Sequence, residues 1–282
     1  MTFINNLALI GILDYAFMRR AFLVGILLAI IVPCIGVIVV LKRLSMIGDA
    51  LSHTALAGVS AGLIMGINPI VGAIAMSILA ALSIEAIRRR IPKYAELATA
   101  IVMSAGIGLA GMLSGFVPNA ANFNSFLFGS IVTISNFELQ LVVVTSVIVL
   151  LVFVILFREL FYMALDERSA RLGGVQVSII NFIFTILTAI TVSVAARTVG
   201  ALVVSSLMVV PVASAMQLAK SYKQTVFWSV GLGILFTVSG LSLSYYHGLK
   251  PGGTIVLIGV AALVVILIFK KLFALRLKSP VQ

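Results

Sequence analysis

The sequence predicts an all-α polytopic membrane protein with about eight or nine transmembrane helices, a short re-entrant segment and a short cytoplasmic helix. Of its 282 residues 62% are hydrophobic and 10% are charged, and the mean hydropathy is +1.27. These values lie outside the range of soluble domains. Apolar stretches of about 20 residues, the length that crosses a bilayer, recur along the chain. The single cysteine, Cys34, excludes an internal disulfide.

Nine apolar stretches are candidate spans, and no polar insertion is long enough to form a soluble domain, so residues 1–282 form one transmembrane domain. The first stretch is judged the weakest, and the count becomes eight or ten if it is re-entrant or if the N-terminal piece also crosses. The segment FNSFLFGSIV at 123–132 is too short to span and is expected to be re-entrant. Residues 1–18 are expected to form an interfacial helix. The nine stretches are 21–41, 46–66, 70–87, 97–115, 138–157, 176–196, 200–218, 225–246 and 254–269.

The basic residues predict the orientation. Every second boundary between spans is basic, whereas the intervening loops hold one lysine. By the positive-inside rule the N-terminus lies outside and the C-terminus inside, and the net charge of +11 reflects this rule rather than nucleic-acid binding. The arginines near the N-terminus follow its apolar stretch, which is the wrong order for a cleavable signal peptide. Arg19, Arg20 and Arg197 are exceptions to the pattern. The basic clusters are Lys42–Arg43, Arg88–Arg90 with Lys93, Arg158 with Arg168 and Arg171, Lys220 with Lys223, and Lys270, Lys271, Arg276 and Lys278.

The longest polar insertion, RELFYMALDERSARLGG at 158–174, lies on the predicted cytoplasmic side. Apolar and charged residues alternate over 161–172 with helical spacing, and Gly173–Gly174 is a typical helix terminator. An amphipathic helix here suits docking of a partner protein. A loop lying on lipid headgroups is an equally open alternative from this stretch alone.

Several chemistries have no motif in the sequence. There is no G-x-x-x-x-G-K-[ST] phosphate loop, so the chain does not hydrolyse ATP by that route. It has no CxxC and no HExxH, and its two histidines and one cysteine cannot build a closed structural zinc site. We therefore expect a non-enzymatic protein.

Asp49 and His53 lie four residues apart in LSMIGDALSHTALAGVSAGLIMG, an otherwise apolar segment. Residues at this spacing share a helix face and are about 6 Å apart along the axis. A charge at membrane depth costs about 2.5–3.5 kcal/mol, so such a residue calls for a function. One carboxylate and one imidazole can ligate zinc, manganese or ferrous iron. The alternatives are a pair that locks two helices together, or a pair at the watery cytoplasmic interface.

Small residues continue the stripe that Asp49 and His53 begin. Ala57 and Ala61 follow on the same face, with Gly58, Gly62 and Gly66 beside it. Small side chains can leave room for a narrow pathway, although close helix packing is their more common use.

The stretch RLSMIGDALSHTALAGVSAGLIMGINPIVGA closely resembles the signature of the metal-ion ABC transporter permeases, the ABC-3 family of zinc and manganese uptake systems. That pattern is a basic residue, then Ser-x-x-Gly-Asp-x-x-Ser-His, then a helix of small residues. The resemblance covers nearly the whole chain, through FLFGSIVTIS (126–135), ALDERSARLGGV (164–175), VGALVVSSLMVVPVASA (199–215) and GLKPGGTIVL (248–257). The residues that match the signature are Arg43, Ser45, Gly48, Asp49, Ser52 and His53.

The resemblance implies the membrane-spanning permease subunit of an ATP-binding cassette importer in a bacterial cell (inner) membrane. It implies a pore formed with a second copy of the chain, metal ligands at Asp49 and His53, cytoplasmic ATP-binding subunits that dock on a coupling helix, and an extracytoplasmic metal-binding protein. We expect Leu165, Asp166 and Glu167 to contact the ATPase. We expect no permanently bound cofactor, zinc as the transported ion with manganese or iron(II) as alternatives, and ATP consumption by the partner.

Pro211, in SLMVVPVASA, is predicted to break or kink its helix, as a gate hinge or as a static kink. Ser205, Ser206 or a neighbouring helix is expected to satisfy the carbonyl that the proline leaves free. Two other classes of function stay open. A secondary transporter would use Asp49 and His53 as a proton relay and would work without ATP, whereas a membrane scaffold would need them only to lock helices.

Overall fold

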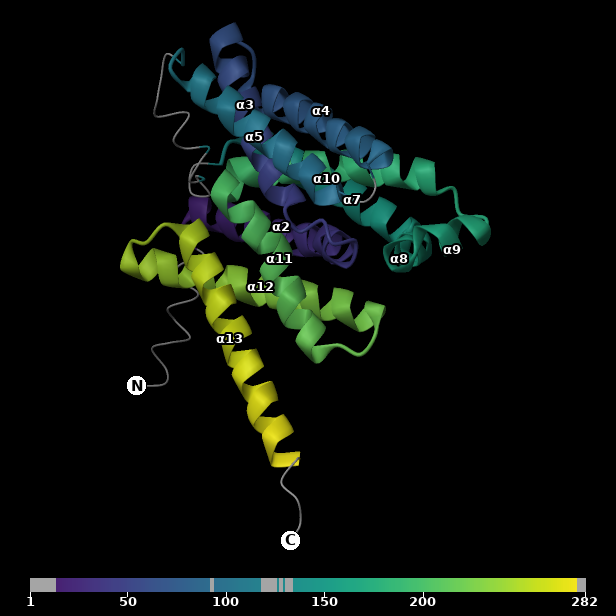
Figure 1. Ribbon diagram of the computed structural model, residues 1–282. Helices are drawn as coiled ribbons and strands as arrows, with labels where there is room; N and C mark the ends of the chain where they lie inside the picture. The colour runs from purple at the N-terminus through teal and green to yellow at the C-terminus, as the bar shows by residue number, and fades with distance from the viewer. Residues whose placement is uncertain (1–13, 92–93, 118–125, 127–128, 130–133, 278–282) are drawn as a thin grey trace.

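The computed structural model describes residues 14–91, 94–117, 126, 129 and 134–277. These residues form helices and turns with no strand among them, which confirms the all-α fold class. Two short helices, α8 (Phe157–Leu165) and α9 (Glu167–Leu172), lie beside the bundle in Figure 1. The long helices are α2 (Ala16–Leu41), α3 (Ile47–Met65), α4 (Pro69–Arg90), α5 (Ala95–Ser114), α7 (Asn136–Ile155), α10 (Val177–Val199), α11 (Ala201–Leu218), α12 (Tyr222–His247) and α13 (Pro251–Leu277).

Each apolar stretch of the sequence corresponds to one long helix in the described part of the chain. Eight of these helices are long and apolar enough to cross a membrane, and α11 is the shorter one. The expectation that the first span is the weakest is wrong, because α2 is the most apolar of the eight candidate spans in the described part of the chain. The helix also continues back through Arg19 and Arg20 to Ala16, and Arg20 donates a hydrogen bond to the carbonyl of Ile134.

Two segments predicted from the sequence fall largely outside the described residues. Of the predicted interfacial helix 1–18, residues 16–18 belong to α2 and residues 1–13 are not described. Of the predicted re-entrant segment 123–132, only Phe126 and Gly129 are described. Phe126 is buried, and Gly129 has a φ of +74° with its Cα against the backbone of Val199, where a Cβ would collide. This part of the segment therefore packs against the end of α10.

The interior of the bundle consists mainly of α2, α3 and α10. In the most apolar stretch of each of these helices 72%, 72% and 67% of the residues are buried, against 28% for α5 and 22% for α13. The outer helices direct large apolar side chains such as Ile101, Val144 and Leu257 outward. In water a helix would turn a polar face outward, so this arrangement is typical of helices surrounded by lipid. The protein is a multi-pass membrane protein.

Glycines allow α3 and α4 to pack backbone against backbone. A Cβ on Gly58 would collide with the carbonyl of Gly72, and a Cβ on Gly72 would collide with that of Gly58. A Cβ on Gly62 would come within 3.2 Å of the Cα of Pro69. Ala57 is fully buried. Gly58, Gly62 and Ala57 therefore serve helix packing, the more common of the two uses considered from the sequence, whereas Ala61 on the face of Asp49 and His53 is partly exposed.

The helix ends gather at two opposite ends of the bundle. We call the end where α2 and α4 finish and α10 begins the basic end, because Lys42 and Arg88 meet Glu167 there. At the opposite end the turn between α3 and α4 lies near the start of α7 and the finish of α10. The basic end is the one that the positive-inside rule assigns to the cytoplasm.

Candidate metal-translocation site

The turn between α2 and α3 fixes where the helix that carries Asp49 begins. Lys42 is the C-cap of α2, and Arg43 follows with a φ of +58°, in the left-handed region. The amide of Leu44 donates to the carbonyl of Val39 at 2.9 Å, and the amide of Arg43 donates to that of Val40 at 3.0 Å. These two bonds form a Schellman motif, a position that glycine usually occupies. The tight turn allows α3 to begin at Ile47, two residues before Asp49.

Asp49 and His53 lie on the one partly exposed face of the first turns of α3. Both side chains are partly exposed, whereas Gly48, Leu51 and Ser52 beside them are buried. Asp49 lies in the first turn of the helix, where the macrodipole favours a carboxylate. Gly48 approaches α11, since a Cβ on Gly48 would come within 3.3 Å of the Cα of Ser205. The start of α3 is thus held against the first turns of α11.

Neither Asp49 nor His53 has a hydrogen bond or ion pair with another described residue. A pair that locks two helices would need such a partner on a neighbouring helix. No group of three or more histidine, cysteine, aspartate or glutamate side chains in the described ranges could hold a metal ion. One chain therefore offers a pair of donors here, open on one side, rather than a closed metal cage.

The segment predicted to be cytoplasmic is two short helices rather than one. The predicted helix over 161–172 is interrupted at Asp166, whose backbone is extended with φ −156° and ψ +114°. The Asp166 carboxylate caps α9 by accepting from the amides of Arg168 and Ser169 at 3.0 and 3.1 Å. Hydrogen bonds from the Ser169 hydroxyl and these amides lower the pKa of Asp166. Asp166 therefore divides the segment, because its side chain favours the N-cap position of a new helix. Helical periodicity alone does not reveal this preference.

The other predictions for this segment concern its apolar residues and its end. Leu165 and Leu172 are 66% and 90% exposed, so both are available to a partner. The segment stops at Gly173–Gly174 as predicted, with Gly174 at a φ of +86° and the amide of Val175 donating to the carbonyl of Ala170. The assignment of Leu165, Asp166 and Glu167 to ATPase docking stays a prediction.

Glu167 has partners within the chain that the sequence did not reveal. Its Oε1 lies 2.8 Å from Nζ of Lys42 and 3.7 Å from Nη2 of Arg88, and it accepts from Nδ2 of Asn181 at 3.3 Å. Burial acts to raise the pKa of Glu167, but the hydrogen bond and charge of Lys42, together with Asn181 and Arg88, outweigh it and lower that pKa. Burial lowers the pKa of Lys42, and Glu167 partly offsets this effect. The network joins α9 to α2, α4 and α10.

Pro211 lies inside α11, which runs unbroken from Ala201 to Leu218. Of the two outcomes predicted from the sequence, a break is therefore not observed. No side-chain hydrogen bond from Ser205 or Ser206 is found in the described residues, so neither serine supplies the partner expected for the freed carbonyl. The role of Pro211 as a gate or a static kink stays a prediction.

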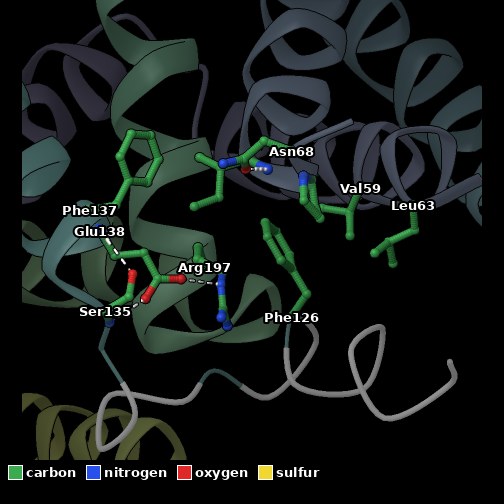
Figure 2. A pocket seen from close by; sticks show the side chains of 10 residues that line it. Val59, Leu63, Asn68, Phe126, Ser135, Phe137, Glu138 and Arg197 are labelled. Carbon is green, nitrogen blue, oxygen red and sulfur yellow. Dashed lines mark hydrogen bonds and ion pairs between the residues drawn. The ribbon is translucent and has the colours of Figure 1, made fainter. Parts of the chain in front are cut away.

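A pocket of about 390 Å³ opens at the end opposite to the basic end, where Figure 2 shows Glu138 and Arg197 directed at one another. Nε of Arg197 lies 2.7 Å from Oε1 of Glu138. The second carboxylate oxygen of Glu138 accepts from the amide of Ser135 at 2.8 Å, which completes a capping box at the start of α7. The pair explains why Arg197 departs from the positive-inside pattern. The spacing Ser-x-x-Glu at 135–138 could have revealed the capping box, but not the contact with Arg197.

Comparison with known proteins adds a family context. A family model described as the ABC 3 transport family matches residues 14–270. A probable metal transport system membrane protein of Treponema pallidum is 36% identical over 257 residues, which cover 90% of this chain and 96% of that protein. The manganese import system permease protein ScaB of Streptococcus gordonii is 28% identical, over 88% of this chain and 89% of that protein. The high-affinity zinc uptake system membrane protein ZnuB of Haemophilus influenzae is 27% identical, over 89% of this chain and 96% of that protein.

The fold also matches a solved structure. A chain of PsaBC from Streptococcus pneumoniae, determined in complex with Fab, is similar with a TM-score of 0.82 and 26% sequence identity. The match covers 92% of this chain and 94% of that chain, so it extends over nearly the whole of both.

Proposed function

This chain belongs to the ABC 3 transport family and is the permease of a metal-ion importer, and we propose that its cargo is a divalent transition metal, with Zn²⁺ in first place, which passes Asp49 and His53 on its way into the cell. We propose that it acts in a bacterial cell (inner) membrane. The ion is cargo and not a resident cofactor, and we expect no permanently bound cofactor.

The observation that carries the proposal is the exposure of Asp49 and His53 and their lack of partners among the described residues. A carboxylate and an imidazole lie on the only partly exposed face of a buried helix start, without partners among the described residues. A transport site must bind an ion well enough to replace its water and weakly enough to release it. Two donors from one chain meet this requirement better than a closed tetrahedral site, and a second copy of the chain or water would complete the coordination.

The choice of metal rests on the chemistry of the donors. One oxygen and one nitrogen donor suit Zn²⁺, Mn²⁺ and Fe²⁺, and by the Irving–Williams order they bind zinc more tightly than manganese. Relatives of this chain are named for zinc and for manganese. Zn²⁺ is the first proposal, and Mn²⁺ and Fe²⁺ are the alternatives within the same class.

The proposed assembly has three kinds of partner. Separate ATP-binding subunits hydrolyse ATP and dock on α8 and α9 at the basic end, where Leu165 is exposed. A metal-binding protein delivers the ion at the opposite end, near the pocket of Figure 2. A second copy of the chain doubles the donors to two carboxylates and two imidazoles around one pore.

The test is metal uptake by cells that lack their own importer and carry this permease with its ATP-binding subunit and metal-binding protein. Asp49→Asn and His53→Ala are each expected to lower uptake of radioactive zinc at least about tenfold, because loss of a ligand or its support typically costs that much. His247→Ala is the matched control, since it removes the other histidine of the chain from an exposed site at the end of α12.

Three other results would change the assignment. Uptake at the wild-type rate in both variants, at equal amounts in the membrane, would leave the pair without a transport role. Uptake that does not need the ATP-binding subunit would favour a secondary transporter. Uptake of manganese in preference to zinc would replace the proposed metal and leave the site unchanged.

A further inference from the structure

Lys42 is a buried cation at the end of α2, and its ammonium contacts both α10 and the start of α9. Its side chain is 6% exposed, and Nζ lies 2.8 Å from Oε1 of Glu167 and 2.6 Å from Oδ1 of Asn181. Asn181 in turn donates to the same Glu167 oxygen at 3.3 Å. The three groups form a closed triangle that joins the end of α2, the start of α9 and the first turns of α10.

This contact differs from an ordinary surface ion pair. Exposed pairs contribute little because water and salt screen them and because two long side chains must be ordered. Here the lysine is buried, and both of its partners also contact each other. Arg88 of α4 adds a second cation 3.7 Å from Glu167 and is held by Glu85 at 2.9 Å. Removal of Glu167 would therefore leave a buried charge without its partner, which proteins tolerate poorly.

The Lys42–Glu167 contact connects the segment proposed to dock the ATPase with the start of α3, which carries Asp49. Glu167 follows Asp166, which divides α8 from α9 in the segment proposed to dock the ATPase. Lys42 precedes Arg43 and Leu44, whose amide bonds to α2 hold the turn in one conformation. Helix α3 begins directly after this turn and carries Asp49 in its first turn.

We propose that Lys42 and Glu167 are positioning residues that transmit movement of the coupling segment α8–α9 to the start of α3. The role in transport rests on the proposed function, whereas the contact between the two residues is observed in the structure. Neither residue touches the metal. Their contact sets where the turn at 42–46, and with it Asp49, lies relative to the docking segment, so that a movement of α9 on ATP binding displaces the start of α3.

The first experiment does not depend on transport. Hydrogen–deuterium exchange is measured on the full chain in lipid nanodiscs, for wild type, Glu167→Gln and Glu96→Gln. Glu96 is the matched control because it is an exposed carboxylate in the first turn of α5 at the same end and has no partner in the described residues. In Glu167→Gln we expect exchange to rise at least about fivefold, the low end of typical coupling between sites, both in 167–174 and in 43–49. A rise confined to 167–174 would overturn the proposal.

The second experiment is a double-mutant cycle in the reconstituted importer with Lys42→Met and Glu167→Gln. The readout is the number of metal ions imported per ATP hydrolysed. Each single change is expected to lower this ratio at least about fivefold while the ATP-binding subunit stays bound, and the double change is expected to be no worse than one single change. Residues that act through one another show this non-additivity, whereas two independent structural defects would add.

The remaining outcomes are decisive. An unchanged ratio in both single variants would overturn the proposal. Loss of the ATP-binding subunit from the Glu167→Gln complex would also overturn it, because Glu167 would then act through the docking contact predicted from the sequence and not through Lys42. Absence of metal import by the wild-type complex, together with the expected exchange changes, would overturn the proposed function and leave the mechanical link intact.

Discussion

Arg43 occupies a backbone conformation that its side chain does not favour. Among the described residues it is the only non-glycine residue with a positive φ. The left-handed conformation costs an L-residue about 1–2 kcal/mol. Strained positions persist where the surroundings determine them, and they gather at functional sites. Here the Schellman bonds on one side and the ion pair of Lys42 on the other hold the turn in place.

The strain at Arg43 can be measured by relieving it. Arg43→Gly is expected to stabilise the permease by up to about 1 kcal/mol, since glycine adopts this conformation without the Cβ penalty and gives back part of the gain as chain entropy. Gly174→Ala is the mirror control, because its φ is +86° and an added Cβ meets nothing within 4 Å. It should destabilise through the backbone alone. Thermal unfolding in detergent checks both. A lower stability of Arg43→Gly would show that its side chain makes a contact that outweighs the strain.

At the scale of elements, the spans were more predictable than the short segments between them. Apolar stretches located the long helices because lipid demands about 20 apolar residues and satisfies no exposed backbone. The sequence did not predict that α9 starts anew at Asp166, because capping competes with helical periodicity at single residues. Nor did it predict the pair of Glu138 and Arg197, since their contact joins helices far apart in the chain.

The apolar side of the coupling segment gives a prediction for docking. Leu165→Asp is expected to reduce coupled transport by roughly an order of magnitude or more, the effect of losing an interface hot spot, while the membrane helices stay folded. Ile91→Asp is the control, because Ile91 is a 50% exposed apolar residue at the end of α4, at the same end of the bundle. Transport and ATP hydrolysis are measured together in proteoliposomes. Wild-type coupling in Leu165→Asp would refute the docking role.

The ion pair at the opposite end gives a second prediction at this scale. Glu138→Gln is expected to destabilise the protein by up to about 3–5 kcal/mol, which is an upper limit because Arg197 is 23% exposed. Glu138→Gln combined with Arg197→Met should recover part of the loss, since no buried charge is then left unpaired. Thermal unfolding of the two variants checks this. Equal loss in both would contradict this account of the charge pair, because Gln at position 138 can still accept from the amide of Ser135 and keep the cap of α7.

At the scale of the whole molecule, composition and spacing predicted the class of protein, and the chemistry of two residues predicted the site. Asp49 and His53 could be selected because ionisable groups are rare at membrane depth. The sequence could not show that Gly58 packs against Gly72, because close helix packing and an open ion pathway both require small residues. It could not show that Lys42, Glu167 and Asn181 contact one another, because this contact depends on how α2, α9 and α10 pack in three dimensions.

A pore shared by two copies would explain why one chain lacks a complete metal site. The described residues of one copy hold no group of three metal-binding side chains, and the open face of α3 carries two. Two copies around a shared pore would bring four donors together. If the proposed pore is correct, the metal binds only in transit, and its selectivity then depends both on these donors and on the protein that delivers the ion.

The most direct test of the central claim is ATP-driven zinc accumulation in proteoliposomes that contain the permease and its ATP-binding subunit, with the zinc-loaded binding protein outside and ATP inside. We predict accumulation in wild type and in His247→Ala, and a loss of at least about tenfold in Asp49→Asn and in His53→Ala at equal ATP-binding-subunit content. Accumulation at the wild-type rate in Asp49→Asn and His53→Ala would contradict the claim that the ion passes these two residues.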